Sequence, residues 1–383
     1  MSDIVIVGAG CAGLSAAVHL VESGCRRPIT LIDPRTRFDR DRTWCFWRVH
    51  SHPFEHCVSH SWSRWRVRGP LGNIEQASER YPYQHIAADD FYHSALERLK
   101  RHDQVELRLG EKVTRVMNVD GRLHVATERD LLDAALVLDS RRPPPQPPAA
   151  HDIVLHQHFR GYFIRTRNDI FDPDSLVLMY FQPSGEHDGV HFIYLLPFSP
   201  RHALIESTWI SEEKQFADAT YDHAIRSYLD RHLTKGGFYS IYASERGVIP
   251  MSTAAMPASS PGIVRIGVAA GMARPSTGYA FLAIQRHSAA LAAAIMAGER
   301  PTASPYTPRS AMLDQIFLSY LSRHWRRGPE LFSRLFTNPR VESVIRFLSG
   351  VGSERDDLSA ALTMPFFPFL LQGFRTTTKR WTA

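Results

Sequence analysis

Residues 3–34 read DIVIVGAGCAGLSAAVHLVESGCRRPITLIDP. This stretch decides the fold, because it predicts a strand, a tight glycine turn, a helix and a second strand in succession. Gly8, Gly10 and Gly13 fit the G-x-G-x-x-G spacing, in which the glycines serve the turn, the approach of a phosphate and the packing of the helix on the strand. The helix N-terminus offers free N–H groups to a pyrophosphate, and Asp33 ends the second strand where a carboxylate binds ribose hydroxyls. We therefore predict a dinucleotide-binding domain.

A second glycine-rich segment lies far downstream. Residues 262–295, GIVRIGVAAGMARPSTGYAFLAIQRHSAALAAAI, predict a strand, a loop and a long Ala-rich helix. The N–H groups of this loop can reach a flavin pyrophosphate and isoalloxazine, and two such segments bracketing a chain indicate FAD rather than NAD. The expected cofactor-binding residues of the loop are Gly267, Gly271, Pro275, Thr277 and Gly278.

The region between these segments predicts an inserted domain. Its strands FRGYFIRT, SLVLMYFQ, VHFIYLLPFS and HALIESTWIS are rich in Val, Ile, Tyr and Phe, as an antiparallel sheet requires. We expect an α/β protein with a Rossmann-like FAD-binding domain of the glutathione-reductase or p-hydroxybenzoate-hydroxylase type, an antiparallel-sheet substrate domain and a helical C-terminal region. The expected boundaries are 1–150 with 245–300 for the FAD-binding domain, 151–244 for the substrate domain and 301–383 for the helices.

Composition restricts the class of protein and its partners. The chain has 383 residues, of which 44% are hydrophobic and 22% charged, with a formal net charge of +6. The excess of Arg indicates either a solvated surface or attraction to anionic lipid head groups, and no nucleic-acid recognition motif accompanies it. The four cysteines have no C-x-x-C spacing, so we expect free thiols and no metal site.

The sequence predicts a cytoplasmic protein that is peripheral to the inner membrane. The N-terminus lacks the basic start of a signal peptide, and no stretch approaches the roughly 20 apolar residues of a membrane span. Residues 362–374, LTMPFFPFLLQGF, contain two prolines. They are interpreted either as a segment that caps the core or as an apolar patch that touches a membrane.

Together these motifs resemble the bacterial lycopene β-cyclase family, flavoproteins of carotenoid biosynthesis. The matching segments extend over the chain: VGAGCAGLSAA, DRTWCFW, YPYQHI, YLLPFSPRHALIESTWIS, ERGVIPM and GVAAGMARPSTGYAF. The resemblance implies a non-redox isomerisation that converts the ψ end groups of lycopene to β-ionone rings, with γ-carotene and β-carotene as products. It also implies FAD in its reduced form, with NAD(P)H as the electron source.

Glu206 is the candidate catalytic residue. It stands within the apolar strand ALIESTWIS, where burial would raise the pKa of a carboxyl group and keep it protonated. The resemblance implies that such an acid starts the cyclisation by protonating a double bond; the alternative is that Glu206 pairs with a buried Arg or caps a backbone group. The resembled family usually has a second acid where this chain has Ser207, and another where Tyr180 follows Met179.

Aromatic side chains in the matching motifs are candidates for lining the polyene and for stabilising a carbocation through cation–π attraction. The alternative is that they are core residues, as buried aromatic side chains usually are, and His85 is interpreted either as a polar contact to the substrate or as a structural histidine. The candidate substrate-binding residues are Trp44, Phe46, Tyr83, Tyr194 and Tyr279.

Other functions are compatible with the same fold. Flavin monooxygenases and halogenases usually carry a Gly-Asp-Ala loop, but this loop reads Gly267, Val268, Ala269, and the W-x-W-x-I run of halogenases is missing. A related polyene cyclase, a flavin-carrying reductase and a polyene carrier are the further alternatives. Cyclisation at one or both ends, and β, ε or γ rings, all agree with the sequence.

Overall fold

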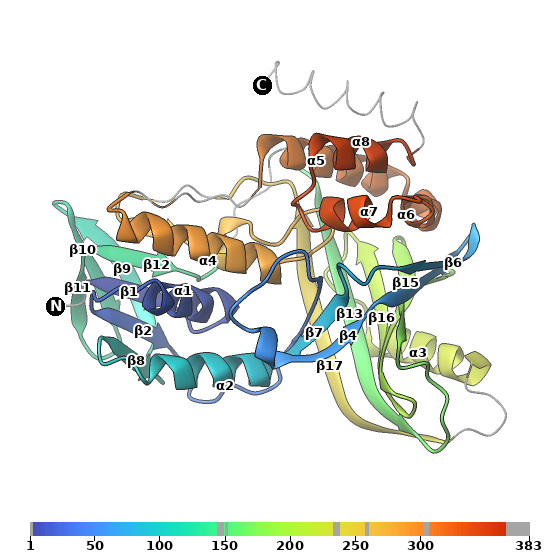
Figure 1. Ribbon diagram of the computed structural model, residues 1–383, viewed down its shortest axis with the longest axis horizontal. Helices are drawn as coiled ribbons and strands as arrows, with labels where there is room; N and C mark the ends of the chain where they lie inside the picture. The colour runs from blue at the N-terminus through green and yellow to red at the C-terminus, as the bar shows by residue number, and fades with distance from the viewer. Residues whose placement is uncertain are drawn as a thin grey trace.

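The computed structural model describes residues 3–143, 149, 152–232, 238–256, 260–299, 301 and 306–364. A parallel sheet with its helices lies beside a large, mostly antiparallel sheet, and four C-terminal helices pack on one face of the large sheet (Figure 1). Most of the proline run at 141–150, and the apolar C-terminal segment from residue 365 onward, lie outside the described residues.

The first sheet is a five-stranded parallel sheet in the order β18-β12-β1-β2-β8. Its central strand reads IVIV and is buried on both faces, as the strands of parallel sheets are. This sheet and the helices that cover it confirm the predicted α/β class. The strands are β1 (Ile4–Val7), β2 (Ile29–Asp33), β8 (Val105–Leu109), β12 (Leu136–Asp139) and β18 (Ile263–Arg265).

Helices pack on one face of the parallel sheet, and a small antiparallel sheet packs on the other. Alternate side chains of β1 and β2 pack against the helices α1 (Cys11–Glu22), α2 (Ala88–Leu99) and α4 (Phe281–Met296). The intervening side chains pack against a three-stranded antiparallel sheet. Its strands are β9 (Val113–Val119), β10 (Arg122–Thr127) and β11 (Leu131–Ala134).

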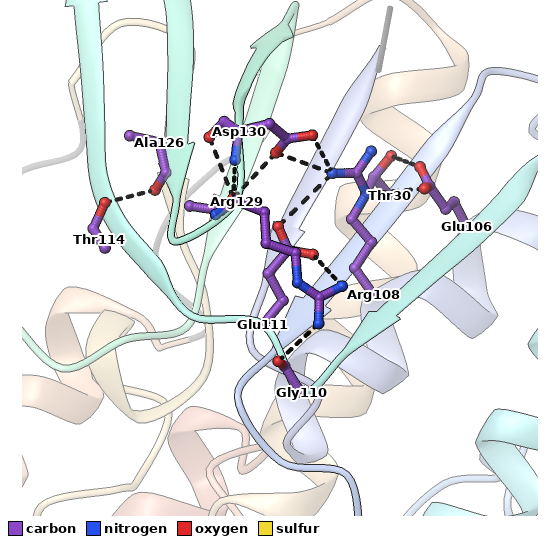
Figure 2. Close-up of polar contacts among 10 residues, drawn as sticks. Thr30, Glu106, Arg108, Gly110, Glu111, Thr114, Ala126, Arg129 and Asp130 are labelled. Carbon is purple, nitrogen blue, oxygen red and sulfur yellow. Dashed lines mark hydrogen bonds and ion pairs between the residues drawn. The ribbon is translucent and has the colours of Figure 1, made fainter.

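A network of ion pairs joins the three-stranded sheet to the end of β8 (Figure 2). Arg108 contacts Glu106 at 2.9 Å and Asp130 at 2.9 Å. The carboxylate of Glu111 is buried, and it lies between the guanidinium groups of Arg108, at 3.8 Å, and Arg129, at 3.7 Å. A buried charge is tolerated when it is paired. Because Arg108 belongs to β8 and Arg129 lies between β10 and β11, their pairing with Glu111 holds the three-stranded sheet against the end of β8.

The second sheet has seven strands in the order β17-β13-β16-β15-β14-β5-β6, and only the pairing of β14 with β5 is parallel. One face packs on α3 (Asp218–His232), and the other faces the C-terminal helices. The strands are β5 (Arg64–Gly69), β6 (Gly72–Ala77), β13 (Val154–Thr166), β14 (Ser175–Gln182), β15 (Val190–Ser199), β16 (His202–Ser211) and β17 (Tyr239–Ser252).

The domain boundaries stay a prediction. At two places the seven-stranded sheet includes residues that the prediction assigns to the FAD-binding domain. Strands β5 and β6 lie inside 1–150 but pair with the seven-stranded sheet. Strand β17 continues across residue 245 as the edge strand of that sheet. The chain therefore enters the second sheet before residue 151 and leaves it after residue 245.

A small antiparallel sheet lies between the two large ones, in the order β3-β7-β4. One face of β3 packs on Phe91 and Phe281, from helices of the parallel sheet, and Trp47 on its other face packs on Trp65 of β5. The strands are β3 (Thr43–Trp47), β4 (Val58–Trp62) and β7 (Tyr83–Ala87), with the 3-10 turn η1 (Glu55–Cys57) before β4.

The C-terminal region is helical, as predicted. It consists of α5 (Pro308–Arg323), η3 (Trp325–Arg327), α6 (Gly328–Phe336), α7 (Val341–Leu348) and α8 (Glu354–Ala361). Among the described residues, none of the helices is both long and apolar enough to cross a membrane.

A buried ion pair ties these helices to the glycine-rich loop. Arg274 and Asp314 are 1% and 2% exposed, with a nitrogen–oxygen distance of 3.0 Å. Ser276 donates to Asp314 at 2.6 Å, and Arg274 also donates to the carbonyl of Phe347 on α7. The loop is thereby fixed to α5 and α7 together.

Arg274→Met should destabilise the fold by about 3–5 kcal/mol, because it leaves the Asp314 carboxylate buried without its cation. Urea unfolding followed by circular dichroism measures the change. The double variant Arg274→Met/Asp314→Leu removes both charges and should recover most of the lost stability. Equal losses in the single and double variants would contradict this role of the pair.

Candidate functional site

The first glycine turn forms a cradle at the start of α1. Gly8 has φ +98°, and a Cβ placed there would lie 2.2 Å from the hydroxyl oxygen of Ser140. A Cβ on Gly13 would lie 1.8 Å from the carbonyl oxygen of Gly8, so the helix packs on the turn only without a side chain. Beside Gly10, by contrast, a Cβ would meet no atom within 4 Å, and no side chain caps the helix. The first N–H groups of α1 therefore face open space, as an anion-binding helix terminus requires.

The charges around this cradle are compatible with a bound phosphate. Burial raises the pKa of the Cys11 thiol, in the first turn of α1, to about 12, so no thiolate opposes an anion there. Asp33 is buried at the end of β2 and accepts hydrogen bonds from the N–H of Ala9 at 2.6 Å and of Arg35 at 2.8 Å. Its role in binding ribose hydroxyls stays a prediction.

The second glycine loop lies against the first. The turn η2 (Gly267–Ala270) follows β18 directly, and a Cβ on Gly267 would lie 2.6 Å from Cβ of Ala12 in α1. Gly271 ends the turn in the left-handed conformation, which glycine adopts without strain. Two segments far apart in the sequence thus line one cradle, and its geometry fits the pyrophosphate of a dinucleotide such as FAD.

The remaining loop residues connect the cradle to the second sheet. Gly278 has φ +72°, and a Cβ on it would lie 3.0 Å from Cγ2 of Ile249 on β17. Pro275 is half-buried, and the hydroxyl of Thr277 donates to the carbonyl of Leu348 at 3.4 Å. The predicted cofactor residues of this loop therefore lie between α1, the second sheet and α7.

Glu206 belongs to a carboxyl pair that crosses three strands. Gly161 on β13 pairs with Glu206 on β16 at one side and with Glu245 on β17 at the other. A Cβ on Gly161 would lie 2.7 Å from Cγ of Glu206. The absence of a side chain at Gly161 thus lets Glu206 lie across β13, where its carboxyl group contacts that of Glu245 by a hydrogen bond.

The surroundings of Glu206 and Glu245 favour a state in which the two carboxyl groups share one proton. Burial raises the pKa of Glu206 well above its usual value, and the charge of Glu245 and the hydrogen bond to it raise it further. Burial also raises the pKa of Glu245, whereas the hydrogen bonds from Glu206 and Thr43 oppose the increase. Thr43 donates to Glu245 at 2.6 Å. We infer that Glu206 carries the proton and donates it to an ionised Glu245.

Three of the predicted substrate residues lie near this pair. Tyr194 is the cross-strand neighbour of Glu206 and donates to the hydroxyl of Tyr83 at 3.1 Å, which in turn contacts Tyr279. Cys45 on β3 contacts Tyr194, and burial raises the pKa of its thiol, as does the charge of Glu206. The structure therefore brings together Glu206 and the three tyrosines from four separate segments.

Trp44 and Phe46 lie elsewhere. Phe46 stacks on Phe281 with ring centroids 4.7 Å apart, and Trp44 packs on Phe91 at 5.0 Å. Because successive side chains of a strand point to opposite faces, Trp44 and Phe46 face α2 and α4, whereas Thr43 faces the carboxyl pair. Their contact with a substrate stays a prediction that this packing does not support.

Ser207 and Tyr180, where the resembled family usually has acids, lie on the face of the seven-stranded sheet that packs on α3, opposite the face of Glu206. Ser207 bonds to His191 at 3.0 Å, and the ring of Tyr180 packs on Tyr228 of α3. Residues on the α3 face alternate with those on the face of Glu206. Acids are therefore missing only at positions that do not face the carboxyl pair.

His85 lies on β7 directly opposite Cys45 of β3. Burial lowers the pKa of His85 to about 3, so its imidazole is neutral. Its Nδ1 contacts the hydroxyl of Ser59 at 2.6 Å, and its buried Nε2 meets no hydrogen-bond partner among the described residues. This leaves one polar atom free for a ligand or a water molecule.

The carboxyl pair and the cofactor loop share β13. Gly278 lies beside Gln157, and Gly161 follows four residues later on the same strand. At about 3.3 Å per residue, the loop and the pair are separated by about 13 Å along the strand. A ligand held at the loop and a ligand held at Glu206 would therefore be neighbours.

A small apolar pocket of about 70 Å³ opens on the other side of this loop, among the C-terminal helices. Its walls are almost free of polar atoms apart from the loop and two carboxylates, as in sites for apolar ligands. The lining residues are Ser276, Thr277, Leu313, Asp314, Ile316, Phe317, Phe332, Leu335, Phe347, Leu348, Asp357, Ala360, Ala361 and Met364.

The parallel sheet, the glycine cradle and the adjoining large sheet define the fold of flavoprotein oxidoreductases. The solved structure of a flavoprotein/dehydrogenase from Cytophaga hutchinsonii has the same fold, with a TM-score of 0.62 at 13% identity and 99% of both chains covered. The sequence profile of the family described as Lycopene cyclase protein matches residues 3–372, and the chain belongs to this family.

Two relatives agree with that membership. The chain is 25% identical to a lycopene beta-cyclase of Pseudescherichia vulneris, over 85% of this chain and 80% of the relative. It is 29% identical to a lycopene beta-cyclase of a Paracoccus species, over 62% of this chain and 63% of the relative. The resemblance stated from the sequence motifs is thereby confirmed.

Sequence reasoning missed Glu245, Thr43 and Gly161. Glu245 and Thr43 lie inside the quoted motifs ERGVIPM and DRTWCFW, but the strand register that brings them to Glu206 is not visible in the sequence. The alternation of side chains along DRTWCFW could have indicated that Thr43 lies on the opposite face from Trp44 and Phe46.

Gly10→Ala should weaken FAD binding at least tenfold while leaving the unfolding midpoint unchanged. The added methyl group meets no protein atom but occupies the space in front of the α1 N-terminus. Flavin fluorescence titration of the apoprotein measures the affinity. Gly13→Ala is the matched control, because its methyl group clashes with Gly8 and should lower stability directly. Unchanged FAD affinity in Gly10→Ala would contradict the cradle.

Proposed function

We propose that this protein is a lycopene cyclase, a flavin-dependent isomerase that converts the ψ end groups of lycopene to β-ionone rings. The relatives named above are lycopene beta-cyclases, and their substrate class suits a site built from buried aromatic side chains. The observation that carries the proposal is the buried carboxyl group of Glu206 beside Glu245, where burial and the charge of Glu245 raise its pKa well above the usual value. A strand gains no stability from a buried acid, so its presence calls for a chemical reason.

Glu206 supplies the proton that the reaction needs. We propose that its carboxyl group protonates the terminal C1=C2 double bond of lycopene, which forms a tertiary cation at C1. The C5=C6 double bond then attacks C1 and closes a six-membered ring, and loss of the C6 proton gives the β ring. One proton enters and one leaves, so the reaction is an isomerisation without net oxidation.

The surroundings of Glu206 would protect and stabilise the cation. Glu245 provides a negative charge at short range, and the faces of Tyr83, Tyr194 and Tyr279 provide cation–π attraction. Burial strengthens these electrostatic effects and excludes water that would capture the cation. Proton donor, negative charge and aromatic faces thus come from one cluster.

FAD is the proposed cofactor, held by Gly8, Gly10, Gly13 and the loop that begins at Gly267. In its reduced form, for which NAD(P)H is the proposed electron source, FAD bound by these residues would supply an electron-rich ring that stabilises positive charge. Lycopene is apolar, so we propose that the protein takes it up at the cytoplasmic surface of the inner membrane, with its net charge of +6 attracting anionic lipids.

Expression in a lycopene-accumulating bacterium tests the activity. Wild-type protein should convert lycopene to cyclic pigments of the same mass and changed absorption spectrum, because an isomerase adds no atoms. Glu206→Gln should lower ring formation at least 100-fold, the scale of lost general acid catalysis, while flavin content stays normal. Pigment with added oxygen mass would favour a monooxygenase, and a fully active Glu206→Gln variant would contradict the assigned acid.

A further inference from the structure

We propose that Glu245 is a second proton-handling residue, which holds Glu206 in its protonated state and carries protons between Glu206 and solvent. This inference rests on the proposed function and adds a residue to its site. It is argued from the position of Glu245, from its partners and from the proton balance of the reaction.

The position of Glu245 links the buried acid to the surface. Glu206 is 6% exposed, on a strand with neighbours on both sides, whereas Glu245 is half-buried on β17, the edge strand of the seven-stranded sheet. The flanking residues Ser244 and Arg246 are exposed. Across Gly161 the two carboxyl groups touch, so a proton that leaves Glu206 for Glu245 moves onto the edge strand of the sheet, next to exposed residues.

The partners of Glu245 favour its ionised form. Thr43 donates a hydrogen bond to it, and the guanidinium of Arg40, paired with Asp89 at 3.0 Å, lies close enough to stabilise its charge. The groups that face Glu206 are Glu245 itself, the Cys45 thiol from β3 and the Tyr194 side chain from β15. No cation stands among the groups that shift the pKa of Glu206.

Because the partners of Glu245 favour its ionised form and those of Glu206 do not, the two acids have different roles in the proposed reaction. Two carboxylates in contact in a buried site repel one another unless a cation lies beside them, so the charge of Glu245 favours the protonated form of Glu206. When Glu206 donates its proton to the substrate, Glu245 remains ionised, and both carboxylates are charged only while the carbocation beside them offsets their repulsion. When the C6 proton leaves the ring, the pair takes it up, and Glu245 exchanges it with water.

The pH dependence of kcat tests the first part of this role. Activity falls as pH rises through the pKa of Glu206, because the donor must be protonated. Glu245→Gln removes the negative neighbour, so the pKa of Glu206 falls and the alkaline limb should move to lower pH by about one unit or more. Glu245→Asp keeps the charge and should return the limb toward its wild-type position.

Isotope content of the product tests the second part. In D₂O with wild-type protein, each new ring should contain one deuterium, because the pair exchanges its proton with solvent between turnovers. In Glu245→Gln, the C6 proton of one substrate returns to Glu206 and passes to the next, so deuterium per ring should fall well below one. Mass spectrometry of the pigment over many turnovers measures this ratio.

Controls separate this inference from the proposed function. Glu75→Gln removes an equal charge from the exposed end of the same sheet and should change neither readout. If Glu206→Gln remains active, the proposed function loses its acid. If Glu206→Gln is inactive while Glu245→Gln keeps the wild-type pH limb and one deuterium per ring, the assignment of Glu245 is overturned and that of Glu206 stands.

Discussion

Two carboxyl groups that touch across Gly161 in a buried site repel one another when both are ionised, and the proposed chemistry of this protein depends on that constraint. It gives a reason for an acid in an otherwise apolar strand, since burial and Glu245 raise the pKa of Glu206 well above its usual value and favour the protonated form. A shape constraint accompanies the electrostatic one, because any side chain at position 161 would separate the two acids. The missing side chain at Gly161 and the charge of Glu245 thus favour a protonated carboxyl group, which is a proton donor, at position 206.

The rest of the fold places this donor beside a cofactor cradle. The parallel sheet presents the α1 N-terminus, and the loop after β18 packs against that helix through Gly267. The same loop contacts β13 and β17 at Gly278 and is fixed to the C-terminal helices by Arg274 and Asp314. The loop after β18 and strand β13 therefore hold the cradle and the carboxyl pair as neighbours. The residues of these two sites come from distant parts of the chain.

Much of this could be predicted from the sequence, because local patterns determine it. The glycine spacing at 8–13 predicted the turn and helix, and VHFIYLLPFS and HALIESTWIS predicted the strands 190–199 and 202–211 that the structure contains. Glu206 was predicted because an acid within an apolar run is a local anomaly. Glu245 was not, because it stands between the polar residues Ser244 and Arg246, and only the long-range register of β17 with β13 brings it to Glu206.

Infrared difference spectroscopy of the holoprotein at neutral pH tests the central claim most directly, because a protonated carboxyl group has a C=O stretching band distinct from the bands of a carboxylate. The account predicts such a band in wild-type protein. The band should shift on exchange into D₂O and be absent from Glu206→Gln. A wild-type spectrum without a protonated-carboxyl band, or a band that persists in Glu206→Gln, would contradict the account.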